Sequence, residues 1–173
     1  MSTDYNATVR TVVSGEGWMG AGVGSIQTAM EELVRSARVE LLVLAYAVSD
    51  GAGELLDLVE DRLRAGVRVT MVVDRLSGQY GAVPGRLESL AQQYAGYCRI
   101  HDFSGAEEGA HLHAKLVAAD RRKALVGSAN LSWHGLVGNH ELAVLVEGPA
   151  VGELVSAAQR LLADPRLRQI GIP

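Results

Sequence analysis

The sequence predicts an α/β fold with a mixed, largely parallel central sheet and helices on both faces. Two apolar runs, at residues 39–48 and 67–73, have the length and composition of buried strands. Segments with apolar residues at helical spacing precede, separate and follow these runs. A strand, helix, strand unit of this kind has a right-handed crossover and makes its two strands parallel, which leaves helices to cover the sheet.

Length and composition indicate one globular domain. A chain of 173 residues can bury a full core but is short for two domains. Apolar residues make up 48% and charged residues 21%, which excludes a disordered or collagen-like chain. We expect a flexible N-terminal arm at residues 1–24, where glycines interrupt any periodicity, and the folded domain at residues 25–173. Trp18 and Met19 within the arm are expected to pack on the domain's own core in preference to a second subunit.

Charge and cysteine content exclude several classes of protein. The net charge of −4 argues against a protein that binds nucleic acid through a uniformly basic surface. The single cysteine, Cys98, has no partner for an internal disulfide, and no Cys/His spacing is typical of a zinc site. No apolar run has the length of a signal peptide core or a membrane span. We therefore expect a cytoplasmic protein that does not cross a membrane.

The first half of the domain reads as alternating helices and strands. A helix begins at Ser25, the strand at 39–48 follows, and Asp50 and Gly51 introduce a second helix that Gly66 ends. After the strand at 67–73, a polar loop carries Arg75 and Tyr80 at a strand's carboxyl end. Ligands often bind at that position, although such loop residues are more often simply solvated.

The second half continues with shorter elements. Pro84 opens a helix that ends near Gly96, and a short strand at 97–102 leads into an acidic loop at 104–109. Two strands at 114–119 and 123–126 form a hairpin with its turn at 120–122. A strand at 142–146 and an amphipathic helix at 151–162 complete the chain.

Small polar and ionisable residues are concentrated around this hairpin. Side chains two residues apart on a strand share a face, so His113 and Lys115 project together, as do Ser128 and Asn130 if the chain stays extended. The small Gly127 lets backbone amides approach an anion with several oxygens. The pattern therefore predicts a phosphate-binding site.

The spacing of these residues resembles the signature of the phospholipase D superfamily. It is written H-x-K-x4-D-x6-G-S-x-N and is matched by His113, Lys115, Asp120, Gly127, Ser128 and Asn130. Asn139 and Glu141 follow where the superfamily usually carries N-x-E. The resemblance implies a phospholipase D-like domain and a phosphodiesterase that needs no metal or other cofactor.

The residue types suit phosphodiester hydrolysis. A neutral His113 can attack phosphorus and form a covalent phosphohistidine. Lys115 supplies positive charge, while Ser128 and Asn130 donate hydrogen bonds to the nonbridging oxygens. Departure of the leaving alkoxide needs a second, protonated imidazole. We expect Asp120, at the turn, to hold the hairpin and not to touch substrate.

The resemblance also implies how the second imidazole is supplied. Superfamily members with two motifs join them across a pseudo-twofold axis, and small single-motif endonucleases dimerise to the same effect. This sequence contains the motif once, so we expect a homodimer whose interface runs beside His113. By the same resemblance, Glu141 accepts a hydrogen bond from the far ring nitrogen of His113 and fixes its tautomer.

Other readings of the histidines are less favoured. A metal site on His111, His113 and Glu141 would place a cation beside the ammonium group of Lys115 and leave the Gly-Ser-x-Asn segment unexplained. His101, His134 and His140 are expected to be structural or surface groups.

The substrate is the least determined property. Small size and the lack of an amphipathic membrane-binding stretch favour a nuclease, with DNA ahead of RNA, over a lipase. The basic turn Arg121-Arg122-Lys123 adds modest support, which the acidic pair Glu107-Glu108 weakens. Related bacterial nucleases serve in restriction or phage defence, so a helicase or defence-complex partner is expected. The alternatives are a phospholipase or phosphatidyltransferase and a non-catalytic nucleic-acid-binding module.

Overall fold

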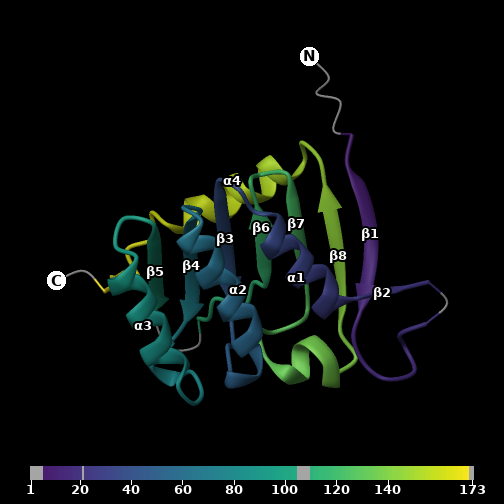
Figure 1. Ribbon diagram of the computed structural model, residues 1–173, viewed down its shortest axis with the longest axis horizontal. Coiled ribbons are helices and arrows are strands. Elements are labelled where there is room, and N and C mark those ends of the chain that lie inside the picture. The colour runs from purple at the N-terminus through teal and green to yellow at the C-terminus, as the bar shows by residue number, and fades with distance from the viewer. Residues whose placement is uncertain (1–5, 21, 105–109, 172–173) are drawn as a thin grey trace.

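A computed structural model describes residues 6–20, 22–104 and 110–171. These residues form one nine-stranded sheet in the order β2-β1-β8-β7-β6-β3-β4-β5-β9 (Figure 1). The strands are β1 (Thr8–Val13), β2 (Gly24–Ser25), β3 (Glu40–Ala45), β4 (Arg68–Asp74), β5 (Cys98–Phe103), β6 (Leu116–Ala119), β7 (Lys123–Gly127), β8 (Leu142–Glu147) and β9 (Leu167–Ile170). The helices are α1 (Ile26–Ser36), α2 (Gly53–Arg64), α3 (Val83–Gln93) and α4 (Val151–Leu161), with short turns η1 (Asp50–Ala52), η2 (Leu76–Gly78) and η3 (His134–Gly138).

The sheet is mixed, as predicted, but it is mostly antiparallel. Only β1 with β2, β3 with β4, and β4 with β5 run parallel among the described strands. The hairpin β6–β7, its neighbours β3 and β8, and the outer pairs β1–β8 and β5–β9 are all antiparallel. The expectation of a largely parallel sheet was therefore wrong, because only the neighbouring strands β3, β4 and β5 join through helix crossovers, whereas the β6–β7 hairpin and distant segments of the chain pair antiparallel around them.

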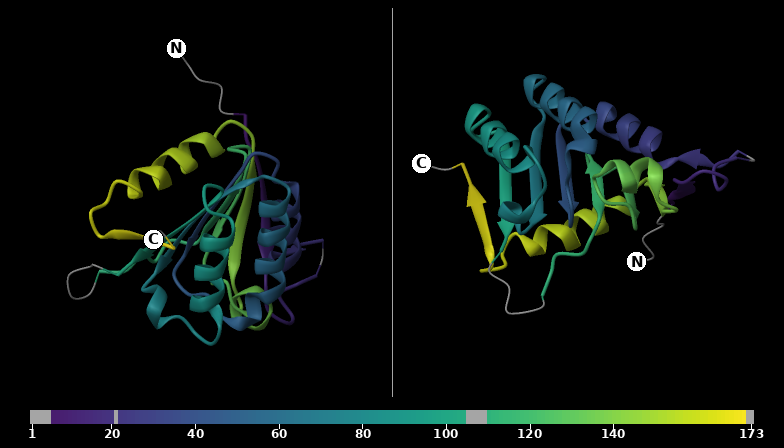
Figure 2. Two further views of the ribbon diagram at one scale, coloured as in Figure 1. Left: turned by 60° about the vertical axis from the view of Figure 1, so that its left-hand side comes forward. Right: turned by 90° about the horizontal axis from the view of Figure 1, so that it is seen from below.

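Helices cover both faces of the sheet, as predicted. Helices α1, α2 and α3 lie side by side on one face, and α4 crosses the other (Figure 2). The larger apolar cluster fills the space under the three helices, with Ile26, Leu56 and Leu87 fully or almost fully buried. A smaller cluster around Val72 and Val151 packs between the sheet and α4. Across the residues that the structure describes, no helix is both long and apolar enough to cross a lipid bilayer.

The predicted flexible arm contains a strand of the sheet. Strand β1 pairs with β8 along its whole length, and Gly24–Ser25 adds a short strand beside it. The buried hydroxyl of Ser14 donates to the carbonyl oxygens of Gly135 (3.0 Å) and Asn139 (2.9 Å). The arm assignment was therefore wrong for this segment, while residues 1–5 and 21 lie outside the described residues. Residues 105–109 of the predicted acidic loop, including its glutamates, also lie outside them.

The topology gathers several strand ends at one edge of the sheet. Because β6 is antiparallel to β3, its beginning lies beside the ends of β3 and β4. The end of β7 and the beginning of β8 lie at the same level through the pair Gly127 and Ala143. We call this border, defined by Ala45, Asp74, Leu116, Gly127 and Leu142, the site edge.

Candidate active site

His113 and Lys115 meet at the site edge, in the extended segment that enters β6. The Nζ atom of Lys115 lies 3.0 Å from Nδ1 and 3.2 Å from Nε2 of His113, and it donates to the His113 carbonyl oxygen at 2.9 Å. The alternation of the strand therefore places both side chains together, as predicted. His113 is exposed, so its ring is accessible to a substrate.

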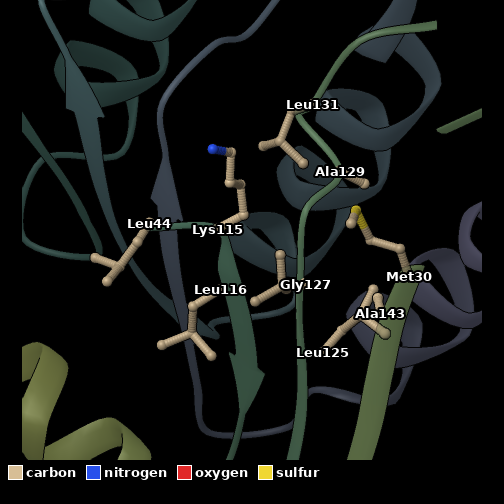
Figure 3. Close-up of a pocket in the computed structure, with 10 residues that line it drawn as sticks. Met30, Leu44, Lys115, Leu116, Leu125, Gly127, Ala129, Leu131 and Ala143 are labelled. Carbon is tan, nitrogen blue, oxygen red and sulfur yellow. The ribbon is translucent and has the colours of Figure 1, made fainter. Parts of the chain in front are cut away.

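Lys115 stands above a small apolar pocket between the hairpin and α1. In Figure 3 its side chain extends above Leu116 and Gly127, and its nitrogen points away from the other labelled residues of the pocket. Burial lowers the pKa of Lys115 below the usual lysine value, and the negative charge of Glu141 opposes part of this effect. Of these two causes, the Glu141 charge is the one that favours the ammonium form of Lys115.

Tyr46, just beyond β3, forms a common floor for the imidazole and amine groups. Its ring centroid lies 4.5 Å from that of His113 and 5.6 Å from that of His111. The Nζ atom of Lys115 lies 5.1 Å from the same centroid, within cation–π range. Sequence reasoning missed Tyr46, although an aromatic residue near the end of an apolar strand was a detectable signal.

Glu141 is bound to two neighbouring polar residues. The Ser128 hydroxyl donates to its Oε2 atom, and the Asn139 side-chain amide donates to Oε1 at 3.3 Å. The backbone amide of Leu142 in turn donates to the Ser128 hydroxyl at 3.2 Å. Within the described part of the chain, the carboxylate makes no hydrogen bond with His113. The predicted contact between Glu141 and His113 is thus not formed in this single chain and stays a prediction for the assembled site.

Asn130, two residues after Ser128 in the chain, presents an unpaired polar atom. Its Oδ1 atom is buried and has no hydrogen-bond partner among the described residues. Leaving such a group unpaired costs roughly 1–3 kcal/mol, and functional sites are one place where proteins retain that cost. Gly135 packs so closely on the Asn130 backbone that a Cβ atom would lie 2.3 Å from its carbonyl oxygen. The position of Asn130 is therefore fixed by the chain around it.

Asp120 ties the hairpin turn to the strand beside it, and its predicted lack of contact with substrate stays a prediction. Its carboxylate accepts the backbone amides of Arg38 (2.9 Å), Val39 (2.8 Å) and Glu40 (2.9 Å), which ties the hairpin turn to the start of β3. Asp120 has a positive φ of 53°, a conformation that aspartate tolerates better than most residues. The residue holds the hairpin from the end opposite the site edge.

The basic turn is also at that opposite end. Arg121 donates to Gln159 (3.0 Å) and Ser156 (2.7 Å) of α4, and Lys123 forms an ion pair with Glu147 at 3.1 Å. Because the turn is separated from His113 by the length of β6, it does not provide a basic surface at the site. The modest support that it gave to nucleic-acid binding is therefore removed.

A second polar group lies beside His113. The Nδ1 atom of His111 lies 2.9 Å from Oδ2 of Asp74, and Nε2 lies 3.1 Å from Nη1 of Arg75. No cluster of three or more His, Cys, Asp or Glu side chains in the described ranges is arranged to hold a metal ion.

Comparisons with known proteins identify the family and the fold. The model of the family described as "Cardiolipin synthase, PLD-like domain" matches residues 30–163. The chain belongs to this phospholipase D-like family. It is 32% identical to the DISARM protein DrmC of Bacillus paralicheniformis over 123 residues. This aligned region covers 70% of this chain and 50% of DrmC. The chain thus spans about half the length of that curated relative.

Solved phospholipase D-like structures share the fold. The family member Nuc from Salmonella typhimurium superposes with a TM-score of 0.74 at 19% identity, covering 94% of this chain and 97% of Nuc. NucT from Helicobacter pylori gives a TM-score of 0.70 at 15% identity, covering 95% and 100%. Phosphatidylserine synthase from Haemophilus influenzae Rd KW20 gives 0.72 at 16% identity, covering 95% of this chain and 40% of the synthase.

Proposed function

We propose that this protein is a metal-independent phosphodiesterase that hydrolyses nucleic acid, with DNA as the preferred substrate. The observation that carries the proposal is the meeting of the exposed His113 imidazole and the Lys115 amine over Tyr46 at the site edge. A nucleophile beside a fixed cation is what attack on an anionic diester requires. Similarity to DrmC and the folds of Nuc and NucT support a nuclease in a defence system, with a helicase or defence complex as its partner.

The proposed reaction has two displacements at phosphorus. In the first, a ring nitrogen of His113 forms a bond to phosphorus, the bond to the leaving oxygen breaks, and a second imidazole gives that oxygen a proton. In the second, water attacks the phosphohistidine, the same imidazole takes the water's proton, and the bond to His113 breaks. Lys115 and Asn130 hold the nonbridging oxygens through both steps, and the amide groups beside Gly127 assist them. Ser128 joins them when its hydroxyl turns from Glu141 to the substrate.

A second copy of the chain supplies the second imidazole in this proposal. Val9 and Leu142 project from the face of β1 and β8 opposite α1, and they are 61% and 46% exposed. Exposed apolar groups of this kind favour burial against a partner. Leu142 directly follows Glu141, so an interface on this face would approach the candidate site.

The decisive experiment is cleavage in EDTA. We expect the purified protein to cut DNA oligonucleotides with EDTA present and the His113→Ala variant to lose the activity by at least about a hundredfold. Trapping a phosphorylated His113 with acid quench would support the covalent step. Cleavage that requires a divalent metal, or an unaffected His113→Ala variant, would contradict the proposal.

Mixing the two proteins tests the shared site. If each site needs one His113 from each chain, a mixed dimer with one His113→Ala chain is inactive, and activity falls as the square of the wild-type fraction. A fall in direct proportion to that fraction would show that each chain works alone. The molar mass measured by light scattering independently gives the number of chains in the assembly.

A lipid substrate is the second candidate. It is favoured by the matched family's description as a cardiolipin synthase domain and by the fold of phosphatidylserine synthase. Release or transfer of a headgroup from phosphatidylglycerol vesicles, without oligonucleotide cleavage, would select this function. Binding of DNA without turnover of either substrate would indicate a non-catalytic binding module.

A further inference from the structure

The cluster of Asp74, Arg75 and His111 lies beside the candidate active site but has no part in the proposed reaction. Asp74 is 3% exposed and accepts two contacts, from Nδ1 of His111 at 2.9 Å and from the Leu112 backbone amide at 2.8 Å. A buried carboxylate with these partners fixes both the ring of His111 and the segment that leads to His113.

The hydrogen bonds determine which nitrogen of His111 carries a proton. A carboxylate only accepts, so Nδ1 donates to Asp74 and Nε2 is left with a lone pair. A guanidinium group only donates, and the Nη1 atom of Arg75 lies 3.1 Å from that Nε2 atom. His111 therefore acts as a neutral link that orients Arg75 from a buried anion.

The backbone at Arg75 is also held in an unusual conformation. Its φ is 42°, in the left-handed region that arginine rarely adopts. The Arg75 amide donates to the Phe103 carbonyl oxygen at 3.2 Å, and the Leu76 amide donates to the buried Asp102 carboxylate at 2.8 Å. Two buried carboxylates thus hold the loop and its arginine side chain in one place.

Tyr46 connects this cluster with the reacting groups. Both His111 and His113 contact its ring. Because Arg75 contacts His111, its guanidinium group is linked to the candidate nucleophile His113 through His111 and Tyr46. Asp102, near the end of β5, lies 3.6 Å from Arg168 and accepts the Leu76 amide. Among the residues that the structure describes, no carboxylate forms an ion pair with Arg75, so its charge can meet a ligand anion.

We infer that Arg75, positioned by His111 and Asp74, binds the phosphate next to the one being cleaved. This rests on the proposed function, and it names the substrate class as a polymer of phosphodiesters. A nucleic-acid strand carries a phosphate at every nucleotide, roughly 3.4 Å apart along the helix axis, whereas a single lipid diester has no such neighbour. The cluster accordingly gives selectivity for nucleic acid over small diesters.

The test compares an oligonucleotide with bis(p-nitrophenyl) phosphate, a diester without a flanking phosphate. We expect Arg75→Gln to raise KM for the oligonucleotide by about tenfold more than for the small diester, with little change in kcat. The magnitude of the slope of log Kd against log salt, measured for oligonucleotide binding in the His113→Ala background, should fall by about 0.7–1. Arg99→Gln, an exposed arginine near the opposite end of β5, is the matched control.

The role of His111 is tested by variants that keep or remove its link. His111→Ala should reproduce the KM effect of Arg75→Gln, and the double variant should be no worse than either single variant. His111→Gln can donate to Asp74 and accept from Arg75, so it should restore much of the affinity. Equal losses on both substrates, or an unchanged salt slope, would overturn the inference. A wild-type protein that cleaves neither substrate would instead contradict the proposed function.

Discussion

The ring of Tyr46 packs against that of His113, with 4.5 Å between their centroids. The tyrosine follows β3 and the histidine precedes β6, so the contact joins neighbouring strands across an antiparallel pair. It fixes the orientation of a side chain that is otherwise exposed. The same ring also receives the Lys115 amine, which makes Tyr46 the shared support of both groups.

We therefore expect Tyr46→Leu to lower kcat/KM by about tenfold, or about 1.4 kcal/mol, which lies within the range of about 1–2.5 kcal/mol for an aromatic and a cation–π contact together. Tyr46→Phe keeps the ring and should retain most of the activity. Steady-state hydrolysis of bis(p-nitrophenyl) phosphate measures both variants. Equal losses in the two variants would assign the effect to the tyrosine hydroxyl instead of the ring.

The charge of Lys115 predicts an alkaline limit to activity. Burial lowers its pKa, so the amine loses its proton below pH 10.5, the ordinary lysine value. Activity that needs the cation should therefore fall as pH rises towards that value, which gives the pH–rate profile an alkaline limb. Glu141→Gln removes the negative charge that favours the ammonium form of Lys115 and should move this limb to lower pH. Lys115→Arg should abolish the limb in any residual activity; a limb that stays in place would exclude Lys115 as its source.

The three amides bound by Asp120 predict a stability effect without a change in chemistry. Asp120→Ala removes these acceptors and places alanine at a positive φ, so it should lower the free energy of unfolding by about 2–4 kcal/mol. Asp120→Asn keeps one acceptor oxygen and tolerates the conformation, so its loss should be about half as large. Urea denaturation measures both. A folded Asp120→Ala protein without activity would contradict a purely structural role.

Gly127 predicts a close-packing effect beside Ser128. A Cβ atom there would lie 2.4 Å from Cβ of Ala143 and 2.5 Å from the Leu142 carbonyl oxygen. Gly127→Ala should therefore separate β7 from β8 and lower stability by about 1–3 kcal/mol. Gly53→Ala is the matched control, since nothing lies within 4 Å of its added Cβ in α2 and helix propensity favours alanine. Thermal unfolding should shift down for the first variant and slightly up for the second.

Cys98 predicts a loss of stability at high pH. Burial raises the pKa of its thiol from 9.0 to about 11. Between these values the unfolded chain releases a proton that the folded chain retains, so the free energy of unfolding decreases as pH rises. Cys98→Ala should show a smaller decrease over this window in urea titrations. Identical slopes for wild type and variant would contradict a buried thiol.

The sequence predicted the elements that carry strong periodicity or fixed spacing. The helices and the buried strands β3 and β4 follow from apolar patterns that local burial determines. The meeting of His113 with Lys115, and the anchoring role of Asp120, followed from strand alternation and the turn. These properties depend on residues that are close together in the sequence, so they can be predicted from the sequence alone.

The missed features depend on contacts between distant segments. Strand β1 was overlooked because the nearby glycines suggested a loop, and because its first four residues are all exposed and its last two are both buried, so it lacks the two-residue alternation of a half-buried strand. Strand β9 is short and lies at the sheet edge, so its sequence carries little strand pattern. Tyr46 joins the site through the sheet's strand order, and spacing along the chain does not encode that order. Arg75 was noted at a strand's carboxyl end, but its link to Asp74 through His111 was not predicted.

The anchoring of the hairpin turn by Asp120 and Arg121 has a practical consequence. Reactive and ligand-facing groups all emerge from one border of the sheet, while the opposite border carries tight turns joined to β3 and α4. A fluorophore or affinity tag attached near Gly96, in the connection between α3 and β5, would therefore allow detection or capture of the protein without contacting the candidate active site. The surface suited to labelling is thus separate from the surface that carries the candidate active site.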